Sequence, residues 1–263
     1  MAYADITSGT LSGYEDVVAG TPPDWRINIQ QATIGQRFDT FNITAQSQTE
    51  PVFTSSKRIN LPISGTGYYQ LSADAGSTYT DVHSTDNMTN ISGALYGKVT
   101  RAVLTKQTPF INTTNTSNPI PDVEYTAGMP AYYGSLRGNL QSTGETTWLT
   151  NHNTSQATLV IPLATAVTAS GLAEVTQTSG TANFRDGGPV PADYSFRYSG
   201  GLTISRSPFD LQITSWATTD LLLANGLTLS GTIVVKTVSA DMNFMRGGPV
   251  PYTFQGTFTG TVT

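Results

Sequence analysis

The chain of 263 residues has no cysteine, only two histidines and few charged residues. The lack of cysteine excludes disulfides, thiolate metal sites and a cysteine nucleophile. The two histidines, His83 and His152, argue against a histidine-ligated metal cluster. Charged residues make up 12% of the chain and the net charge is −5. Phosphate neutralisation needs clustered Lys and Arg, so this balance argues against a nucleic-acid-binding surface.

Long apolar runs are also missing. The longest apolar stretch, Leu159 to Ala169, is interrupted by Pro162 and two threonines. It is too short to span a membrane and favours a buried pair of strands. The N-terminal residues lack the basic and apolar regions of a secretory signal. We therefore expect a soluble protein that is made in the cytoplasm and does not enter a membrane.

The low charge is itself informative, because the surface of a soluble domain is commonly about 25–35% charged. Thr, Ser, Asn and Gln could solvate the surface instead. Alternatively, much of the surface is buried against other copies of the chain, which is the interpretation we favour.

Threonine makes up about one residue in six. It is a strand former and a poor helix former, so the composition predicts a mainly β fold. Period-two alternation supports this, because aromatic residues alternate with polar ones in two segments. The aromatic positions are Tyr194, Phe196 and Tyr198 in one segment and Tyr252, Phe254 and Phe258 in the other. Phe41, Ile43 and Ala45 give a weaker third example.

Both aromatic segments belong to an internal repeat. Residues 170–200 align without gaps to residues 230–260, with 12 of 31 positions identical. The shared motif begins with Asn-Phe, at 183–184 and 243–244, and continues as Gly-Gly-Pro-Val-Pro, at 187–191 and 247–251. Glycine permits positive φ and proline ends strand pairing, so the repeat predicts a β-hairpin used twice.

A weaker periodicity of about 134 residues predicts a tandem duplication. Its anchors include Thr85-Asp86, which matches Thr219-Asp220. Each half is expected to have a hairpin–helix–hairpin order with one short helix. In the second half the helix would be capped at 218–220, run through 221–224 and stop at Gly226; in the first half it would begin near Ser84. The predicted organisation is an N-terminal arm (residues 1–23), a first β domain (24–143) and a second β domain (144–263). A single larger β-sandwich with recurring hairpins is the alternative.

The residues carry little sign of chemistry. His83 and His152 lie in polar stretches typical of exposed loops, so neither is expected to act as a catalytic base. Asp186 could imitate a calcium-binding or acidic catalytic turn, but the repeat has Arg246 in its place. The shared role of that turn is therefore expected to be conformational. No calcium loop or phosphate-binding glycine loop is present. We predict no catalytic, cofactor-binding or metal-binding residues, and a protein that is not an enzyme.

The three tryptophans, Trp25, Trp148 and Trp216, are far apart in the sequence. They could form a sugar-stacking platform, but packing in the core or in an interface is the expectation.

Residues 231–239 open on glycine, and the alternating aromatic residues 251–260 end on glycine. These closing segments resemble the closing pair of strands of the phage major tail tube family. Residues 96–104 and 132–138 of the first half resemble the same pair. The likeness covers about a third of the chain.

The resemblance implies a virion structural protein: tube-like β-sandwich domains that self-associate into rings, whose strands line a β-barrel channel. The rings would be hexamers, or trimers with pseudo-six-fold symmetry if each chain supplies two tube domains. Rings would stack, with the long loop at 106–130 contacting the next ring, and would meet other tail proteins. The viral genome would pass through the channel transiently, and a neutral or acidic wall suits DNA passage.

Two other functions remain open from the sequence. A capsid cement or decoration protein would also be β-rich and uncharged, but would be a monomer or trimer on the shell. A carbohydrate-binding or adhesin module would depend on surface Trp and Asp.

Overall fold

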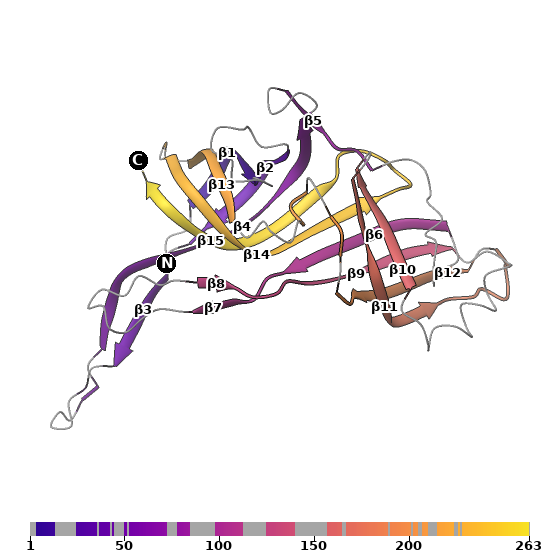
Figure 1. Cartoon of the computed structure of the whole chain (residues 1–263), viewed down its shortest axis with the longest axis horizontal. Helices are drawn as coiled ribbons and strands as arrows, with labels where there is room; N and C mark the ends of the chain where they lie inside the picture. Colours follow the sequence, from indigo (N-terminus) through magenta and orange to yellow (C-terminus); the bar gives the residue numbers. More distant parts are fainter. Residues whose placement is uncertain are drawn as a thin grey trace.

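The computed structural model describes most of the chain (Figure 1). The described residues are 4–13, 25–35, 37–42, 44, 50–51, 53–72, 78–84, 98–112, 125–139, 157–164, 167–188, 190–200, 202–204, 207–209, 215–223, 226 and 228–262. The regular elements among these residues are all β-strands, which confirms the predicted mainly β class.

The strands of the first half are β1 (Ala4–Gly13), β2 (Trp25–Ile34), β3 (Arg37–Asn42), β4 (Phe53–Ser72), β5 (Tyr79–Asp81), β6 (Lys98–Gln107), β7 (Phe110–Asn112), β8 (Tyr125–Ala127) and β9 (Ala131–Asn139). Those of the second half are β10 (Ala157–Ala164), β11 (Val167–Gly180), β12 (Pro191–Tyr198), β13 (Ser215–Leu223), β14 (Thr228–Asn243) and β15 (Pro251–Val262). Thirteen strands form one sheet, and β7 pairs with β8 separately. All of the pairings are antiparallel.

Part of the large sheet closes on itself. Strands β14, β13, β1, β2, β4 and β15 follow one another by hydrogen bonding, and β15 pairs back to β14. Closure removes the exposed edges of these strands. The ring of strands encloses the side chains of Leu11, Trp25, Ile27 and Tyr69, all fully buried.

The rest of the sheet extends from β14. Residues 228–234 of β14 pair with β13 inside the closed part, whereas residues 237–243 pair with β6. The order then continues through β9, β12 and β11 to β10. This single long strand therefore joins the two parts of the sheet, and Figure 1 shows it running beside β6.

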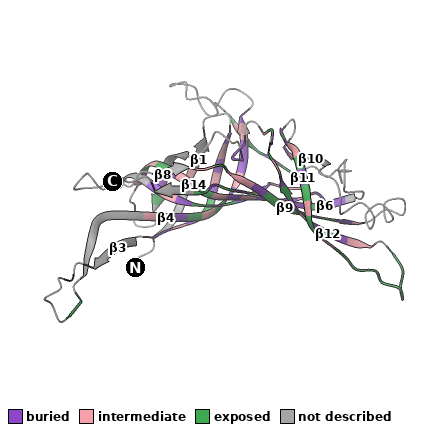
Figure 2. Cartoon of the chain, turned by 60° about the horizontal axis from the view of Figure 1, so that its bottom comes forward, coloured by how far each residue is buried: buried purple, intermediate pink, exposed green. Residues whose placement is uncertain are grey.

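Buried and exposed residues alternate along these strands, as Figure 2 shows. The aromatic positions predicted in both repeat segments are buried, whereas Asp193, Arg197, Thr253 and Gln255 are exposed. The predicted strand pair at Leu159 to Ala169 is also confirmed as β10 and β11, because Leu159, Ile161 and Ala169 are buried.

The repeat is a hairpin used twice, as predicted. Strands β11 and β12 form the first copy, and β14 and β15 the second. Both connections place two glycines at positive φ: Gly187 at 67° and Gly188 at 106°, and Gly247 at 61° and Gly248 at 94°. This is the left-handed region that glycine tolerates best, so the Gly-Gly pair fixes the same turn in both copies.

The predicted helix of the second half is wrong. Residues 218–223 belong to strand β13, with Leu221 buried and Leu222 39% exposed. Strand β13 pairs with β1 on one side and β14 on the other, and this pairing outweighs the helix propensity of a short leucine run. Gly226 has a positive φ of 82°, but the element before it is a strand that ends at Leu223. In the first half, Ser84 is described and not helical, and the remaining predicted helix residues lie outside the described ranges.

The predicted arm is also wrong for residues 4–13. These residues form β1, which lies between β13 and β2 and contributes the fully buried Leu11 to the core. One partner, β2, is the next strand along the chain, but the other, β13, lies near the far end of the sequence. Residues 14–23 lie outside the described residues.

The predicted halves interleave in the sheet. Strand β9 of the first half pairs with β12 of the second, β6 with β14, and β4 with β15. The boundary at 143/144 lies outside the described residues, as does Thr85-Asp86, so the 134-residue duplication stays a prediction. The long connection at 106–130 contains the small β7–β8 ribbon.

Candidate functional site

One face of the sheet carries a row of polar side chains that crosses seven strands. In register, the row runs from β12 through β9, β6, β14, β15 and β4 to β2. Its members in order are Arg197, Tyr133, Thr105, Ser239, Thr253, Thr66 and Gln31. Directly opposed residues of neighbouring strands share a face, so these side chains lie on one surface, which we call the polar face.

Two further rows belong to the polar face. One comprises Gln107, Thr237, Gln255, Ser64 and Thr33. The other comprises Asp241, Val103, Ser135 and Ser195. All of these side chains are exposed or partly exposed. The face is therefore broad and made chiefly of hydroxyl and amide groups.

The polar face is hollowed where β2, β4, β15 and β14 meet. The hollow has a volume of about 370 Å³. Its polar lining is Gln31, Thr33, Ser64, Thr66, Thr237, Thr253 and Gln255. Register irregularities lie beside it in β2, between Ile29 and Gln31, and in β14, between Val235 and Thr237. Such bulges bend a strand and increase its local twist, which fits the concave shape.

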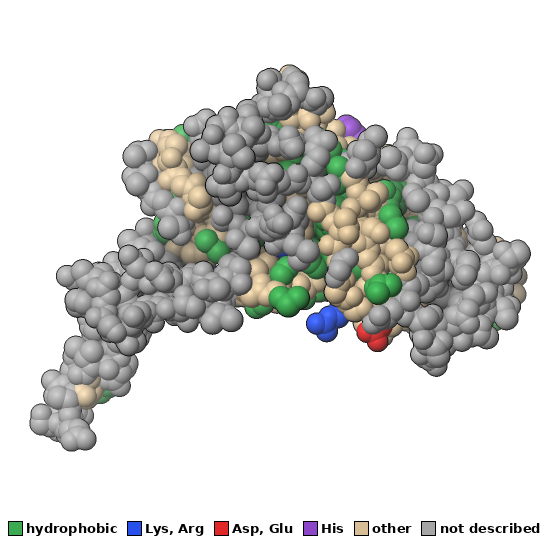
Figure 3. Space-filling view, viewed as in Figure 1, with side chains coloured by type: hydrophobic (Ala, Val, Ile, Leu, Met, Phe, Trp, Pro, Cys, Tyr) green, Lys and Arg blue, Asp and Glu red, His purple; other side chains and the backbone are tan. Residues whose placement is uncertain are grey.

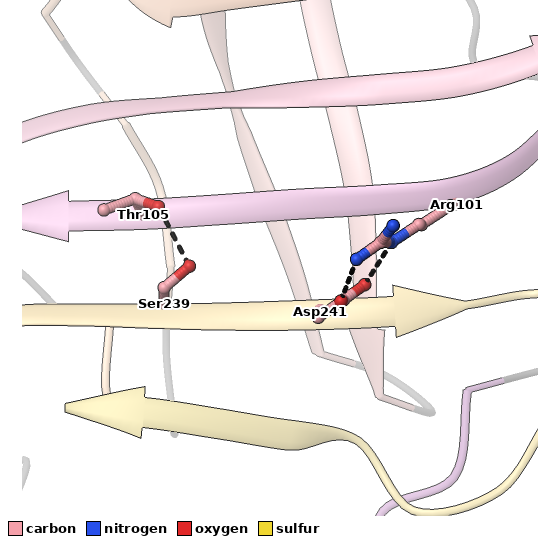
Figure 4. A network of polar contacts seen from close by, with 4 residues as sticks. All are labelled: Arg101, Thr105, Ser239 and Asp241. Carbon is pink, nitrogen blue, oxygen red and sulfur yellow. Dashed lines mark hydrogen bonds and ion pairs between the residues drawn. The ribbon is translucent and has the colours of Figure 1, made fainter. Parts of the chain in front are cut away.

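Two cations on the polar face lie beside carboxylates on the next strand. Arg101 of β6 forms a two-point ion pair with Asp241 of β14; the Nε–Oδ1 distance is 2.7 Å (Figure 4). Hydrogen bonding to Asp241 raises the pKa of the Arg101 guanidinium further above its usual value. Arg137 of β9 lies 3.7 Å from Asp193 of β12. These pairs leave little net positive charge on this part of the face.

Uncharged side chains of neighbouring strands also contact each other on the polar face. The hydroxyl groups of Thr105 and Ser239 are 3.0 Å apart between β6 and β14 (Figure 4). In the space-filling view, the described surface consists mostly of uncharged atoms, with few basic or acidic groups (Figure 3). A surface of this kind interacts weakly with a polyanion, because clustered cations are what bind phosphate.

The opposite side of the same strands is fixed by aromatic packing. Phe196 and Tyr198 pack edge to face at 5.4 Å, and Tyr69 contacts Tyr252 at 5.2 Å. The Tyr198 hydroxyl donates a hydrogen bond to the Leu159 carbonyl at 3.2 Å. These buried rings hold alternate residues inward, and so hold the polar face outward.

The residues considered for chemistry in the sequence are not brought together. His83 is exposed and pairs in an isolated bridge with Pro249, whereas His152 lies outside the described residues. Among the described residues there is no group of three His, Cys, Asp or Glu that could hold a metal ion. No helix in the described part of the chain is long and apolar enough to cross a membrane.

Asp186 contacts a residue of its own turn. Asn183 Nδ2 donates a hydrogen bond to Asp186 Oδ2 at 2.9 Å, inside the turn. Trp25 is fully buried with its ring 6.4 Å from that of Tyr69, which confirms core packing for this tryptophan. The side chain of Trp216 and all of Trp148 lie outside the described set.

The polar face was missed by the sequence interpretation. The sequence pattern of a polar surface is present within each strand, where Thr, Ser and Gln alternate with apolar residues. The rows themselves depend on the register between strands that are far apart in the sequence.

No protein-family model matches the chain, and no curated protein matches it in sequence. Two solved structures resemble it in part. One is a chain from the tail of an empty gene transfer agent particle refined with C6 symmetry; the TM-score is 0.36, the identity 11%, and the match covers 52% of this chain and 92% of that one. The other is a chain from the virion of a native gene transfer agent particle; the TM-score is 0.32, the identity 12%, and the match covers 44% of this chain and 95% of that one.

Proposed function

We propose that the chain is a virion structural protein of the tail tube kind, whose copies form stacked rings around a channel for the genome. The observation that carries this proposal is the polar face. It is a continuous surface of hydroxyl and amide groups across seven strands, and two of its arginines, Arg101 and Arg137, lie beside carboxylates. In the assembly, this face lines the channel.

The electrostatics of the face suit passage of DNA. A wall with free Lys and Arg would hold the phosphate backbone and slow its movement. On the polar face, Asp241 and Asp193 neutralise Arg101 and Arg137. The chain as a whole is acidic, with a net charge of −5. Both features favour a wall that DNA slides past without being retained.

The sheet also suits ring formation. Strand β10 is the last strand in the order and pairs with β11 alone among the described strands. An edge strand of this kind is available for pairing with another chain. Rings made from several copies would cover such edges by joining their sheets, as barrels do. Trimeric rings with pseudo-six-fold symmetry and hexameric rings both satisfy this requirement.

Negative-stain imaging of the purified protein tests the proposal. We expect hollow tubes with a regular axial repeat, formed without any other protein. A monodisperse monomer or trimer that coats capsids would favour a cement protein instead. A monomer that binds glycans would favour the carbohydrate-binding module and would overturn the tube proposal.

A further inference from the structure

The two copies of the repeated hairpin have the same turn but different surroundings. In each turn the asparagine side chain accepts hydrogen bonds from the backbone: Asn183 Oδ1 from Arg185 N at 3.1 Å, and Asn243 Oδ1 from Met245 N at 3.1 Å. The first glycine N–H donates to the asparagine carbonyl at 3.1 Å in one copy and 3.2 Å in the other. The turns therefore present equivalent backbone groups and an equivalent phenylalanine.

The turn at 243–250 is covered by an extended segment of the same chain. Ser84 N donates to the Gly248 carbonyl at 2.9 Å, and Val250 N donates to the Val82 carbonyl at 2.9 Å. The Ser84 hydroxyl also donates to the Asn243 carbonyl at 2.8 Å. In the same turn Phe244 is 1% exposed, and its N–H donates to the Thr100 carbonyl at 3.0 Å. The segment Val82–Ser84 thus pairs with the turn as a short added strand.

The turn at 183–190, which we call the open turn, has no such cover. Phe184 is 96% exposed, although it is the counterpart of Phe244. Every described side chain from Asn183 to Asp186 is exposed. Within the described part of the chain, no segment pairs with the Gly188 carbonyl or the Val190 N–H as Val82–Ser84 pairs with the other turn. Contact with a partner at this turn would remove the apolar surface of Phe184 from water, which is favourable.

Both turns lie at the same end of the sheet. Pro191, which follows the open turn, is opposite Asn139 at the end of β9. Asn243, which begins the covered turn, is opposite Arg101 near the start of β6. The ribbon β7–β8 follows the other end of β6, and Figure 1 places it at the opposite end of the long strands. The open turn therefore projects from the end of the subunit, where a neighbouring copy can reach it.

We propose that the open turn docks onto a second copy of this chain, which buries Phe184 and pairs an extended segment with the turn. The inference rests on the proposed function, because it names a contact between copies in the tube. The low net charge of the open turn supports a second copy of the chain as its partner. Arg185 and Asp186 are adjacent and cancel, and the segment that covers the other turn, Val82–Ser84, carries no Asp, Glu, Lys or Arg. The chain has only 12% charged residues, so another copy offers the neutral, hydroxyl-rich surface that such a turn fits.

The first test is the variant Phe184→Ser. It should fold as the parent does, with an unchanged thermal midpoint, because Phe184 makes little contact within the subunit. The protein concentration needed for tube formation should rise roughly tenfold or more, since burial of this ring would be lost. Light scattering gives that concentration. Met245→Ser, at a side chain 63% exposed in the covered turn, is the matched control and should assemble normally. If Phe184→Ser assembles at the parental concentration, the inference is wrong.

The second test is a photo-crosslinking phenylalanine analogue at position 184. Under assembly conditions it should give a covalent dimer of the chain on a denaturing gel, with the peptide bonded to position 184 identified by mass spectrometry. Tubes that form without this dimer overturn the docking inference and leave the proposed function standing. A dimer from a protein that forms no tubes supports the docking contact and counts against the tube.

Discussion

Replacement of Gly134 by alanine is expected to destabilise the chain by about 3 kcal/mol, which is a large share of the stability of a domain. Gly134 lies in β9 between β6 and β12, opposite Phe196. A Cβ at this position would overlap the Val103 carbonyl oxygen and would approach Phe196 Cζ to 2.8 Å. The overlap with backbone cannot be relieved by rotating a side chain, so the strands themselves must separate.

Gly171→Ala is the matched control for this prediction. Its added Cβ would meet Leu202 Cδ1 and Tyr198 Cδ1 at 3.1 Å and Leu202 Cα at 3.3 Å, so it overlaps far less with its neighbours than a Cβ at position 134 would. Its cost should stay under about 1 kcal/mol. Guanidinium unfolding of both variants gives the comparison. Equal stability of Gly134→Ala and the parent would show that β9 does not lie this close to β6.

Stability is expected to fall steeply as the pH rises above 10. Burial raises the pKa of Tyr194 to about 12, and raises the pKa values of Tyr198 and Tyr252 well above the ordinary value of 10. A raised pKa in the folded state means that the folded chain keeps protons which the unfolded chain releases. The stabilisation is therefore fully present below pH 10 and is lost between pH 10 and the folded-state pKa.

Each of these tyrosines contributes a slope of about 1.4 kcal/mol per pH unit inside that window. Tyr194→Phe removes one titrating group, so the decrease in stability with pH should become shallower by about 1.4 kcal/mol per pH unit. Guanidinium unfolding at a series of alkaline pH values measures the slope. A parental slope near zero between pH 10 and pH 12 would mean that these rings are accessible to solvent in the folded chain.

The sequence predicted the parts of the fold that local chemistry determines. The Gly-Gly pairs at 187–188 and 247–248 need positive φ, and that requirement is visible in the motif. The buried aromatic faces of β12 and β15 follow from period-two alternation within single strands. The turns and the buried faces of these strands depend only on residues a few positions apart in the sequence, so the sequence alone can predict them.

The rest depends on pairing across long sequence distances. Residues 221–223 have the composition of a helix, but strand neighbours on both sides hold them extended. Residues 4–13 are polar and near the terminus, yet β2 and β13 hold them in the sheet. The polar face was hidden for the same reason, because its rows join residues as distant as Gln31 and Thr253. The exposure of Phe184 is equally non-local, since its sequence context matches that of the buried Phe244.

A single-cysteine variant can show whether the polar face lines the channel of a tube. Ser135→Cys places a thiol on the exposed part of this face, in a chain that has no other cysteine. In free subunits, a small maleimide and a bulky polymer-linked maleimide should both react. In assembled tubes, the small reagent should still react through the channel, whereas the bulky one should be excluded, as intact-mass measurement would show. Equal reaction of both reagents in intact tubes would place the polar face on the outside and contradict the account.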